Sequence, residues 1–158
     1  ILSSLVGSEM CIRDRHFEKE DAVAISLKFA NQAVGSFLLS DRTPSPWTWE
    51  MALGESEKFP KTGMNAIRFL GTEGALEFPN LVLWRHAEGN GNWHHEIRPE
   101  VIDAPFIDAY VAQCAHLRAV TRGLETPIID ALNGSRSLDA TLAAARAAIS
   151  GTRIKLSM

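Results

Sequence analysis

Apolar and polar residues alternate through residues 21–29, and the alternation returns in residues 34–41 after the short turn Ala-Asn-Gln-Ala. A period of two places successive side chains on opposite faces of an extended chain, so each segment is predicted to be a half-buried β-strand. The two strands and the turn between them form a predicted hairpin. The apolar face of the first strand consists of Val23, Ile25, Leu27 and Phe29.

Shorter extended segments follow, separated by turn residues. Two prolines in "RTPSP" end the hairpin, and the glycine-containing "GTEG" and "AEGNGN" supply later turns. The strands expected here are residues 47–54, 66–70, 75–78, 81–85 and 93–98.

The pattern then becomes helical. Apolar residues recur every three or four positions, first at Phe106, Tyr110, Cys114, Leu117 and Thr121, and again at Leu138, Leu142, Ala145 and Ile149. Asp103 is the expected N-cap of the first helix, and Gly123 and Gly151 are expected to end the two helices.

The second helix is rich in alanine and can therefore lie close to a sheet, and residues 152–156 form a last short strand. Strands, two helices and a final strand predict an α+β fold, a mostly antiparallel open sheet with helices packed on one face.

Composition and charge limit the kinds of partner that we expect for this chain. The chain has 158 residues, which suits one domain with a core, and a net charge of −3 without a basic cluster. We therefore expect no nucleic-acid partner. No apolar run approaches the roughly 20 residues that cross a bilayer, so we expect no membrane partner. Two cysteines do not suggest a disulfide framework, and we expect a cytoplasmic protein in which Cys114 is a buried, inert thiol.

The segment "SDRTPSPWTWE", residues 40–50, carries the richest chemistry. Tryptophan indoles offer flat apolar walls with one N–H donor, and carboxylates accept hydrogen bonds from hydroxyl groups. We therefore regard Asp41, Trp47, Trp49 and Glu50 as candidate substrate-binding residues for a sugar or polyol. The alternative is that the two tryptophans simply pack against the sheet.

Two other stretches contain residue types that are common in metal and dinucleotide sites. In "WHHE", residues 93–96, the adjacent histidines of a predicted strand would point to opposite faces, so we expect no metal site, and His94 is a candidate polar contact in a cleft. The "GNG" of residues 89–91 lacks the third glycine and the following helix of a dinucleotide site, so a hairpin turn is expected. We predict no cofactor-binding and no catalytic residue in this chain.

Four stretches resemble the C-terminal domain of the glucose–fructose oxidoreductase / inositol dehydrogenase (Gfo/Idh/MocA) family. They are "EDAVAISLKFANQAVGSFLLSD", "IRFLGTEGALEFP", "FIDAYVAQCAHLRAVTRGLETPIID" and "GSRSLDATLAAARAAISGTRIKL". Each is similar to a hairpin or helix motif of the family, and their order and spacing carry the resemblance. Asn31-Gln32 departs from the usual hairpin glycine, and Leu132-Asn133-Gly134 from the usual Asp-Gly.

The resemblance implies a longer parent protein, an NAD(P)-dependent oxidoreductase of a sugar, polyol or related hydroxy compound. Its Rossmann domain, catalytic lysine and Asp/His pair would lie upstream of His16, so this fragment alone would be inactive and would bind no NAD or NADP. The family's open sheet also implies a homo-oligomer through the sheet face. Two alternatives remain: a stand-alone binding or assembly module of the same fold, and a relative that binds the cofactor without catalysis.

The first fifteen residues follow none of these patterns. Residues 5–15, "LVGSEMCIRDR", are similar, residue for residue, to the translation of a DNA adapter used in transposon-based sequencing libraries. We therefore expect residues 1–15 to be a non-native, adapter-derived segment. Residues 16–158 are then the Gfo/Idh/MocA-like C-terminal domain, a fragment of a two-domain protein.

Overall fold

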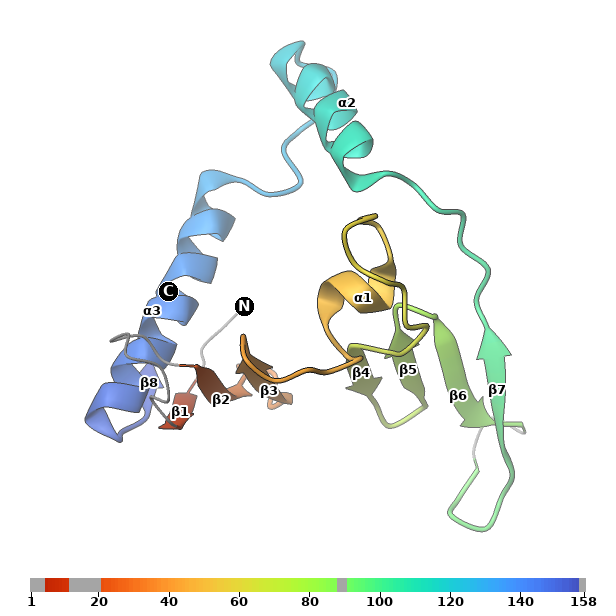
Figure 1. Ribbon diagram of the computed structural model, residues 1–158, viewed down its shortest axis with the longest axis horizontal. Coiled ribbons are helices and arrows are strands. Elements are labelled where there is room, and N and C mark those ends of the chain that lie inside the picture. The colour runs from red at the N-terminus through yellow and green to blue at the C-terminus, as the bar shows by residue number, and fades with distance from the viewer. Residues whose placement is uncertain (1–4, 12–20, 88–90, 157–158) are drawn as a thin grey trace. The chain divides into compact units, whose positions relative to one another are not determined.

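The computed structural model describes residues 21–87 and 91–156 and the backbone of residues 5–11 (Figure 1). They fall into two compact units, Ile1–Thr43 with Ala119–Met158, and Pro44–Arg118. The first unit contains β1 (Leu5–Cys11), β2 (Ala22–Lys28), β3 (Val34–Ser40), α3 (Ala131–Ser150) and β8 (Ile154–Lys155). The second contains α1 (Trp49–Leu53), β4 (Ile67–Leu70), β5 (Ala75–Phe78), β6 (Val82–His86), β7 (Ile97–Val101) and most of α2 (Ala109–Thr121).

The first unit is a four-stranded antiparallel sheet in the order β3-β2-β1-β8. The predicted β2–β3 hairpin is confirmed, with Ala22 opposite Ser40 and Lys28 opposite Val34. Phe29 N–H donates to the Ala33 carbonyl over 2.9 Å, and Gln32 takes a left-handed φ of 69°. Gln32 therefore fills the conformation that a glycine commonly supplies in such turns.

Helix α3 packs on this sheet through alanines. Ala143, Ala144 and Ala147 are buried against Leu156, with Ile25, Leu27 and Ile154 beside them. The close approach expected from alanine is confirmed, but the predicted Leu138, Leu142, Ala145 and Ile149 stripe is wrong, because all four are exposed. The branched side chains of the sheet occupy the space under the helix, so the smallest face of α3 fits there.

The second unit holds another antiparallel sheet, in the order β4-β5-β6-β7. The α+β prediction is confirmed, although these residues form two four-stranded sheets rather than one. The strand predicted over residues 47–54 is wrong, because residues 49–53 form helix α1. Thr48 caps α1 by accepting the N–H of Met51 over 3.4 Å, and Gly54 ends it with a φ of 69°.

Helix α2 begins later than expected. Its first turn is capped by Asp108, which accepts the N–H of Val111 over 2.9 Å, so the prediction of Asp103 is wrong. Gly123 ends the helix as predicted, with Gly123 N–H bonded to Val120 and Leu124 N–H to Ala119.

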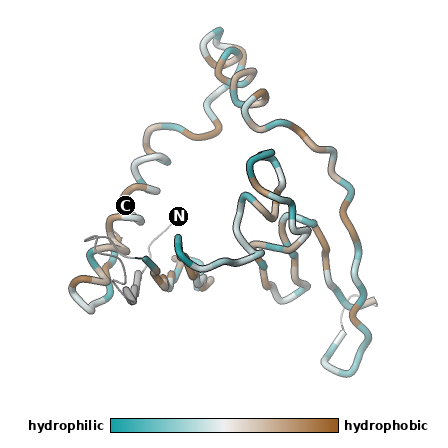
Figure 2. The backbone as a smooth tube through the Cα atoms, in the orientation of Figure 1, coloured by the Kyte–Doolittle hydropathy of each residue, from teal (hydrophilic) through white to brown (hydrophobic). Residues whose placement is uncertain are grey.

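Helix α2 has no buried residue, in contrast to the packing expected of it. Figure 2 shows hydrophobic positions recurring along α2 and the segment before it. Cys114 is exposed, so the prediction of a buried thiol is wrong. In the part of the chain that the structure describes, no helix has the length and apolarity to span a membrane.

Candidate functional site

The candidate segment begins with a rigid turn at the end of β3. Ser40 Oγ accepts the N–H groups of Arg42 and Thr43, each over 3.3 Å. Asp41 N–H donates to the Asp21 carbonyl over 3.3 Å, and the Arg42 guanidinium lies 3.8 Å from the buried Asp21 carboxylate. Asp41 itself is exposed to solvent, on a backbone that these hydrogen bonds hold in place.

The next part of the segment belongs to the second unit and carries the two tryptophans. Trp49 opens α1 and stacks on Phe78 of β5 with ring centroids 5.4 Å apart and planes inclined by 28°. Half of Trp49 stays exposed, so the ring presents a supported apolar surface. Trp49 therefore packs against the sheet through Phe78, and its exposed half stays a candidate ligand surface.

Trp47 and Glu50 are less supported. Trp47 is 60% exposed, and its backbone N–H donates to Ser45 Oγ over 3.2 Å. Thr62 Oγ1 donates to the carbonyl of Pro46 over 2.8 Å, which fixes the chain just before Trp47. Glu50, in the first turn of α1, is exposed. One short segment thus offers an indole face and a free-standing carboxylate to solvent.

A polar network that the sequence analysis did not identify surrounds β5. Asn65 Nδ2 donates to Glu77 Oε2 over 3.1 Å, and Asn65 Oδ1 accepts the N–H of Asn80 over 3.1 Å. Asn80 Nδ2 in turn donates to the Gly63 carbonyl over 2.7 Å. These hydrogen bonds are made on β5 and just after it, so they help to position Phe78, on which Trp49 stacks. The asparagines that flank the predicted 66–70 and 75–78 hairpin were its only sequence signal.

His94 lies on a turn and not on the predicted strand. Its N–H donates to Asn92 Oδ1 over 3.0 Å, and His95 N–H donates to the Asn92 carbonyl over 2.9 Å, so an Asx turn shapes residues 92–95. The opposite-face argument for these histidines is therefore wrong. Among the described residues, no group of three or more His, Cys, Asp and Glu side chains could hold a metal ion. Residues 88–90, which include most of the "GNG" turn, lie outside the described residues.

Behind this turn, His86 and His95 meet edge to face with ring centroids 6.4 Å apart. His86 Nδ1 is buried without a hydrogen-bond partner, and a side chain at Gly91 would collide with the His86 ring. Next to them, Arg98 donates to Glu96 over 2.7 Å, and this hydrogen bond and the positive charge lower the pKa of Glu96.

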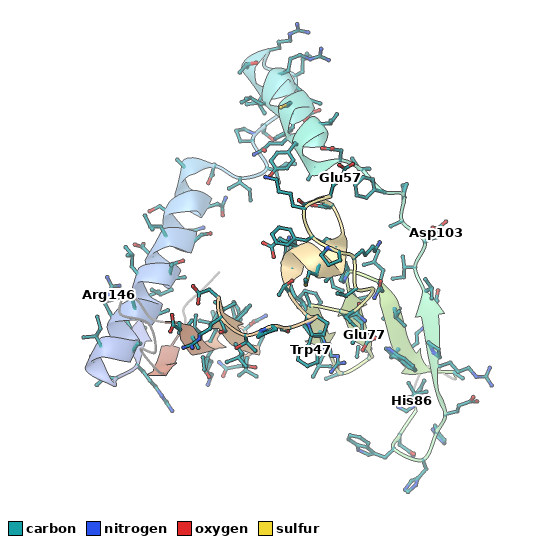
Figure 3. The ribbon with its side chains drawn as sticks, in the orientation of Figure 1. Trp47, Glu57, Glu77, His86, Asp103 and Arg146 are labelled. Carbon is teal, nitrogen blue, oxygen red and sulfur yellow. The ribbon has the colours of Figure 1, made fainter. Side chains whose placement is uncertain are left out.

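Trp47, Trp49 and Glu50 follow closely in sequence at the start of α1, and His94 lies on a separate turn. Figure 3 shows Trp47 near the β4 end of the second unit and His86 at the far end of β6. Within the described part of the chain, no hydrogen bond, ion pair or ring contact links His94 to the aromatic segment. Asp41 belongs to the first unit.

Comparison with solved structures identifies the fold. The WlbA dehydrogenase of Bordetella pertussis, in complex with NADH and UDP-GlcNAcA, is 20% identical with a TM-score of 0.60, and the match covers 98% of this chain and 39% of that one. The aldose-aldose oxidoreductase of Caulobacter crescentus, complexed with glycerol, is 20% identical with a TM-score of 0.63, covering 98% and 42%. This chain has the fold of the C-terminal domain of Gfo/Idh/MocA-type oxidoreductases.

A third structure with this oxidoreductase fold is an enzyme from Agrobacterium radiobacter in complex with NAD+, L-tartaric acid and magnesium. It is 14% identical with a TM-score of 0.63, and the match covers 98% of this chain and 43% of that one. The chain therefore spans less than half the length of these three oxidoreductases. No family model and no curated protein matches the sequence.

Proposed function

We propose that this chain is the C-terminal substrate-binding and assembly domain of a longer NAD(P)-dependent oxidoreductase, here called the parent. The parent acts on a sugar, polyol or related hydroxy compound. The observation that carries the proposal is the coverage: nearly the whole chain matches about two fifths of each oxidoreductase named above. Hydride transfer needs a bound nicotinamide, which the remaining part of the parent would hold and orient.

The proposed substrate-binding residues are Asp41, Trp47, Trp49, Glu50 and His94. Trp49 on its Phe78 support offers an apolar surface suited to the C–H face of a sugar ring, and the 60% exposed Trp47 offers a second indole. Glu50, in the same unit, is proposed to accept hydrogen bonds from substrate hydroxyl groups. Asp41, which belongs to the first unit, is a separate candidate with the same chemistry. His94, on its separate turn, is proposed to contact a different part of the substrate.

The proposed assembly surface is the face of the β2–β3 hairpin opposite α3, and it joins copies of the parent. Residues directly opposite each other in an antiparallel pair share a face, so Val34, Ser36 and Leu38 lie on the side away from Ile25 and Leu27. Val34 is 79% and Leu38 81% exposed. This face also carries Ser26, Ser36 and Lys28, and the exposed Val34 and Leu38 among them are suited to contact with a second subunit.

Residues 1–15 are proposed to be adapter-derived and not part of the parent. The backbone of Leu5–Cys11 pairs as β1, and such main-chain pairing is open to any extended segment, so pairing is consistent with this origin. Resequencing the genomic locus tests it. Genomic reads that continue unchanged through codons 5–15 would refute the adapter origin.

Calorimetric titration with NADH tests the oxidoreductase proposal. We expect no heat of binding from the 158-residue chain and clear binding by the protein translated from the complete genomic frame. NADH binding by the 158-residue chain, or its absence from the complete protein, would contradict the proposal. The alternative, a stand-alone binding or assembly module, predicts a start codon near His16 and no Gly-rich strand–turn–helix upstream.

A further inference from the structure

Thr62 ties together the chain on both sides of the start of α1. Its hydroxyl donates to the Pro46 carbonyl over 2.8 Å, and its backbone N–H donates to the Met51 carbonyl over 3.0 Å. Pro46 lies before Thr48, the N-cap of α1, and Met51 lies within the helix. The side chain of Thr62 therefore holds the approach to α1, while its backbone holds the helix itself.

The peptide unit between Pro46 and Trp47 is bonded at both of its polar atoms. The Pro46 carbonyl oxygen and the Trp47 N–H belong to one planar group. Thr62 Oγ1 bonds the oxygen, and Ser45 Oγ accepts the N–H over 3.2 Å. The ring of Pro46 also holds its own φ at about −65°. The peptide plane from which Trp47 departs is therefore fixed by two hydroxyl groups, one of which comes from a distant part of the chain.

The two tryptophans of the proposed surface have different supports. Trp49 stacks on Phe78 of β5 with ring centroids 5.4 Å apart, so the sheet holds its side chain. Trp47 is 60% exposed, and within the described residues no ring stacks on it. Its position depends on the backbone that Thr62 and Ser45 hold. Loss of the Thr62 hydroxyl should therefore loosen Trp47 and leave Trp49 in place.

We propose that Thr62 is a positioning residue of the substrate-binding surface, and that it holds Trp47 through the Pro46 carbonyl. This inference rests on the proposed function. A surface that is ordered before binding loses less free energy when the substrate arrives, so Thr62 contributes to affinity and not to the chemical step. The hydroxyl is the group that acts, so serine can replace threonine here, whereas valine has the same shape without the donor.

Backbone ¹⁵N relaxation on the 158-residue chain tests the hold on Trp47. We expect an order parameter of about 0.85 for the Trp47 N–H in the original chain and below about 0.6 in Thr62→Val, the values of rigid and flexible backbone. The Trp49 N–H should not change. Thr62→Ala, which adds no bulk, should act like Thr62→Val, and Thr62→Ser should keep Trp47 rigid.

Thr72→Val is the matched control for the relaxation measurement. Thr72 is exposed in the turn between β4 and β5, and in the part of the chain that the structure describes its side chain makes no hydrogen bond. We expect it to leave Trp47 rigid. Equal order parameters at Trp47 in Thr62→Val and in the original chain, or equal loosening of Trp47 and Trp49, would overturn the proposal.

Steady-state kinetics of the protein translated from the complete genomic frame test the effect on substrate. Thr62→Val should raise KM roughly fivefold, the equivalent of one neutral hydrogen bond, with little change in kcat. The assay follows NADH formation from glucose, myo-inositol or glycerol. Loss of folded enzyme would instead lower the apparent kcat at unchanged KM. That outcome, or failure of Thr62→Ser to restore KM, would also overturn the proposal.

The two measurements separate this inference from the proposed function. The relaxation measurement needs neither cofactor nor substrate. Absence of NADH binding by the complete protein would contradict the oxidoreductase proposal and leave the Trp47 result standing. NADH binding together with a rigid Trp47 in Thr62→Val would keep the oxidoreductase proposal and refute the role of Thr62.

Discussion

Asn65 ties three segments of the second unit together. Its amide donates to Glu77 on β5, and its carbonyl oxygen accepts the N–H of Asn80 in the turn that follows β5. Both atoms are partly buried, so removing the side chain leaves polar groups that water reaches poorly. Because β5 carries Phe78, this single residue helps to hold the surface on which Trp49 lies.

We expect Asn65→Ala to lower the free energy of unfolding by about 1–2 kcal/mol. Urea unfolding followed by tryptophan fluorescence measures it. Asn31→Ala is the matched control, since Asn31 Oδ1 accepts an exposed turn N–H from Ala33 over 3.2 Å and should cost less. Equal effects of the two substitutions would show that the Asn65 network does not hold β5.

Glu50 allows the proposed substrate contact to be measured in the parent. Loss of a hydrogen bond donated to a charged group costs about 1.5 kcal/mol or more, which corresponds to roughly tenfold in affinity. We expect Glu50→Gln to raise KM about tenfold with little change in kcat, assayed by NADH formation from glucose, myo-inositol or glycerol. Glu57→Gln, an exposed carboxylate of the same unit, is the control. Unchanged KM in Glu50→Gln would remove Glu50 from the site.

The Glu96–Arg98 pair makes a local contribution that depends on pH. The hydrogen bond from Arg98 and its charge lower the pKa of Glu96, so the interaction is present at neutral pH and is lost as the pH falls through that lowered pKa. We expect Arg98→Gln to return the pKa of Glu96 to its ordinary value in a carboxyl NMR titration. Arg68→Gln, which removes the partner of Glu77, should leave Glu96 unchanged.

At the scale of elements, the face of α3 that packs on the sheet is the one that carries small side chains. Ala143, Ala144 and Ala147 on this face are buried, while Leu138 and Ile149 of the same helix are exposed. Asp130 caps the helix by accepting the N–H of Asn133 over 2.7 Å, and Gly151 ends it with a φ of 64°. Local capping therefore fixes the ends of the helix, and the sheet selects its rotation.

We expect Ala147→Leu to destabilise the first unit by about 1–3 kcal/mol, because the larger side chain cannot fit between α3 and the sheet. Ala145→Leu, on the exposed side of the same helix, should be nearly neutral. Thermal unfolding followed by circular dichroism compares the two. A similar loss in both variants would mean that the alanine face is not tightly packed.

At the scale of the whole molecule, many large apolar side chains of the described residues are exposed. Those at least 79% exposed include Val34, Leu38, Leu70, Trp93 and Tyr110. The buried hydrophobic residues in the described part are Ala52, Ala143, Ala144, Ala147 and Leu156. Such a chain is suited to burial against other protein, as the proposed assembly domain requires.

We expect Leu38→Asp to dissociate the oligomer of the parent, because a carboxylate on the outer face of the hairpin would be buried without a partner. Light scattering after gel filtration measures the mass. Ile149→Asp is the control, since Ile149 is equally exposed, 79% against 81%, but lies on α3. An unchanged mass in Leu38→Asp would exclude this face as the assembly surface.

Local patterns predicted the elements well and the site only in part. The alternation of residues 21–29 and the Ala-Asn-Gln-Ala turn located the β2–β3 hairpin, because register and turn are set by neighbours in sequence. Periodicity predicts a strand over residues 47–54 where the structure has the five-residue helix α1, because the signals of α1 are the Thr48 cap and Gly54 and not a period. It also predicts a strand at His94, where the Asx turn at Asn92 overrides the extended propensity of the neighbouring residues.

The sequence by itself determined the β2–β3 hairpin, the ends of α2 and α3 at Gly123 and Gly151, and the class of fold, since these depend on short-range periodicity and backbone conformation. Only the tertiary structure decided which face of α3 meets the sheet, what supports Trp49, and that β2 and β8 do not pair with each other. Those outcomes depend on the volumes and unpaired backbone groups of segments far apart in sequence, and no local pattern records them.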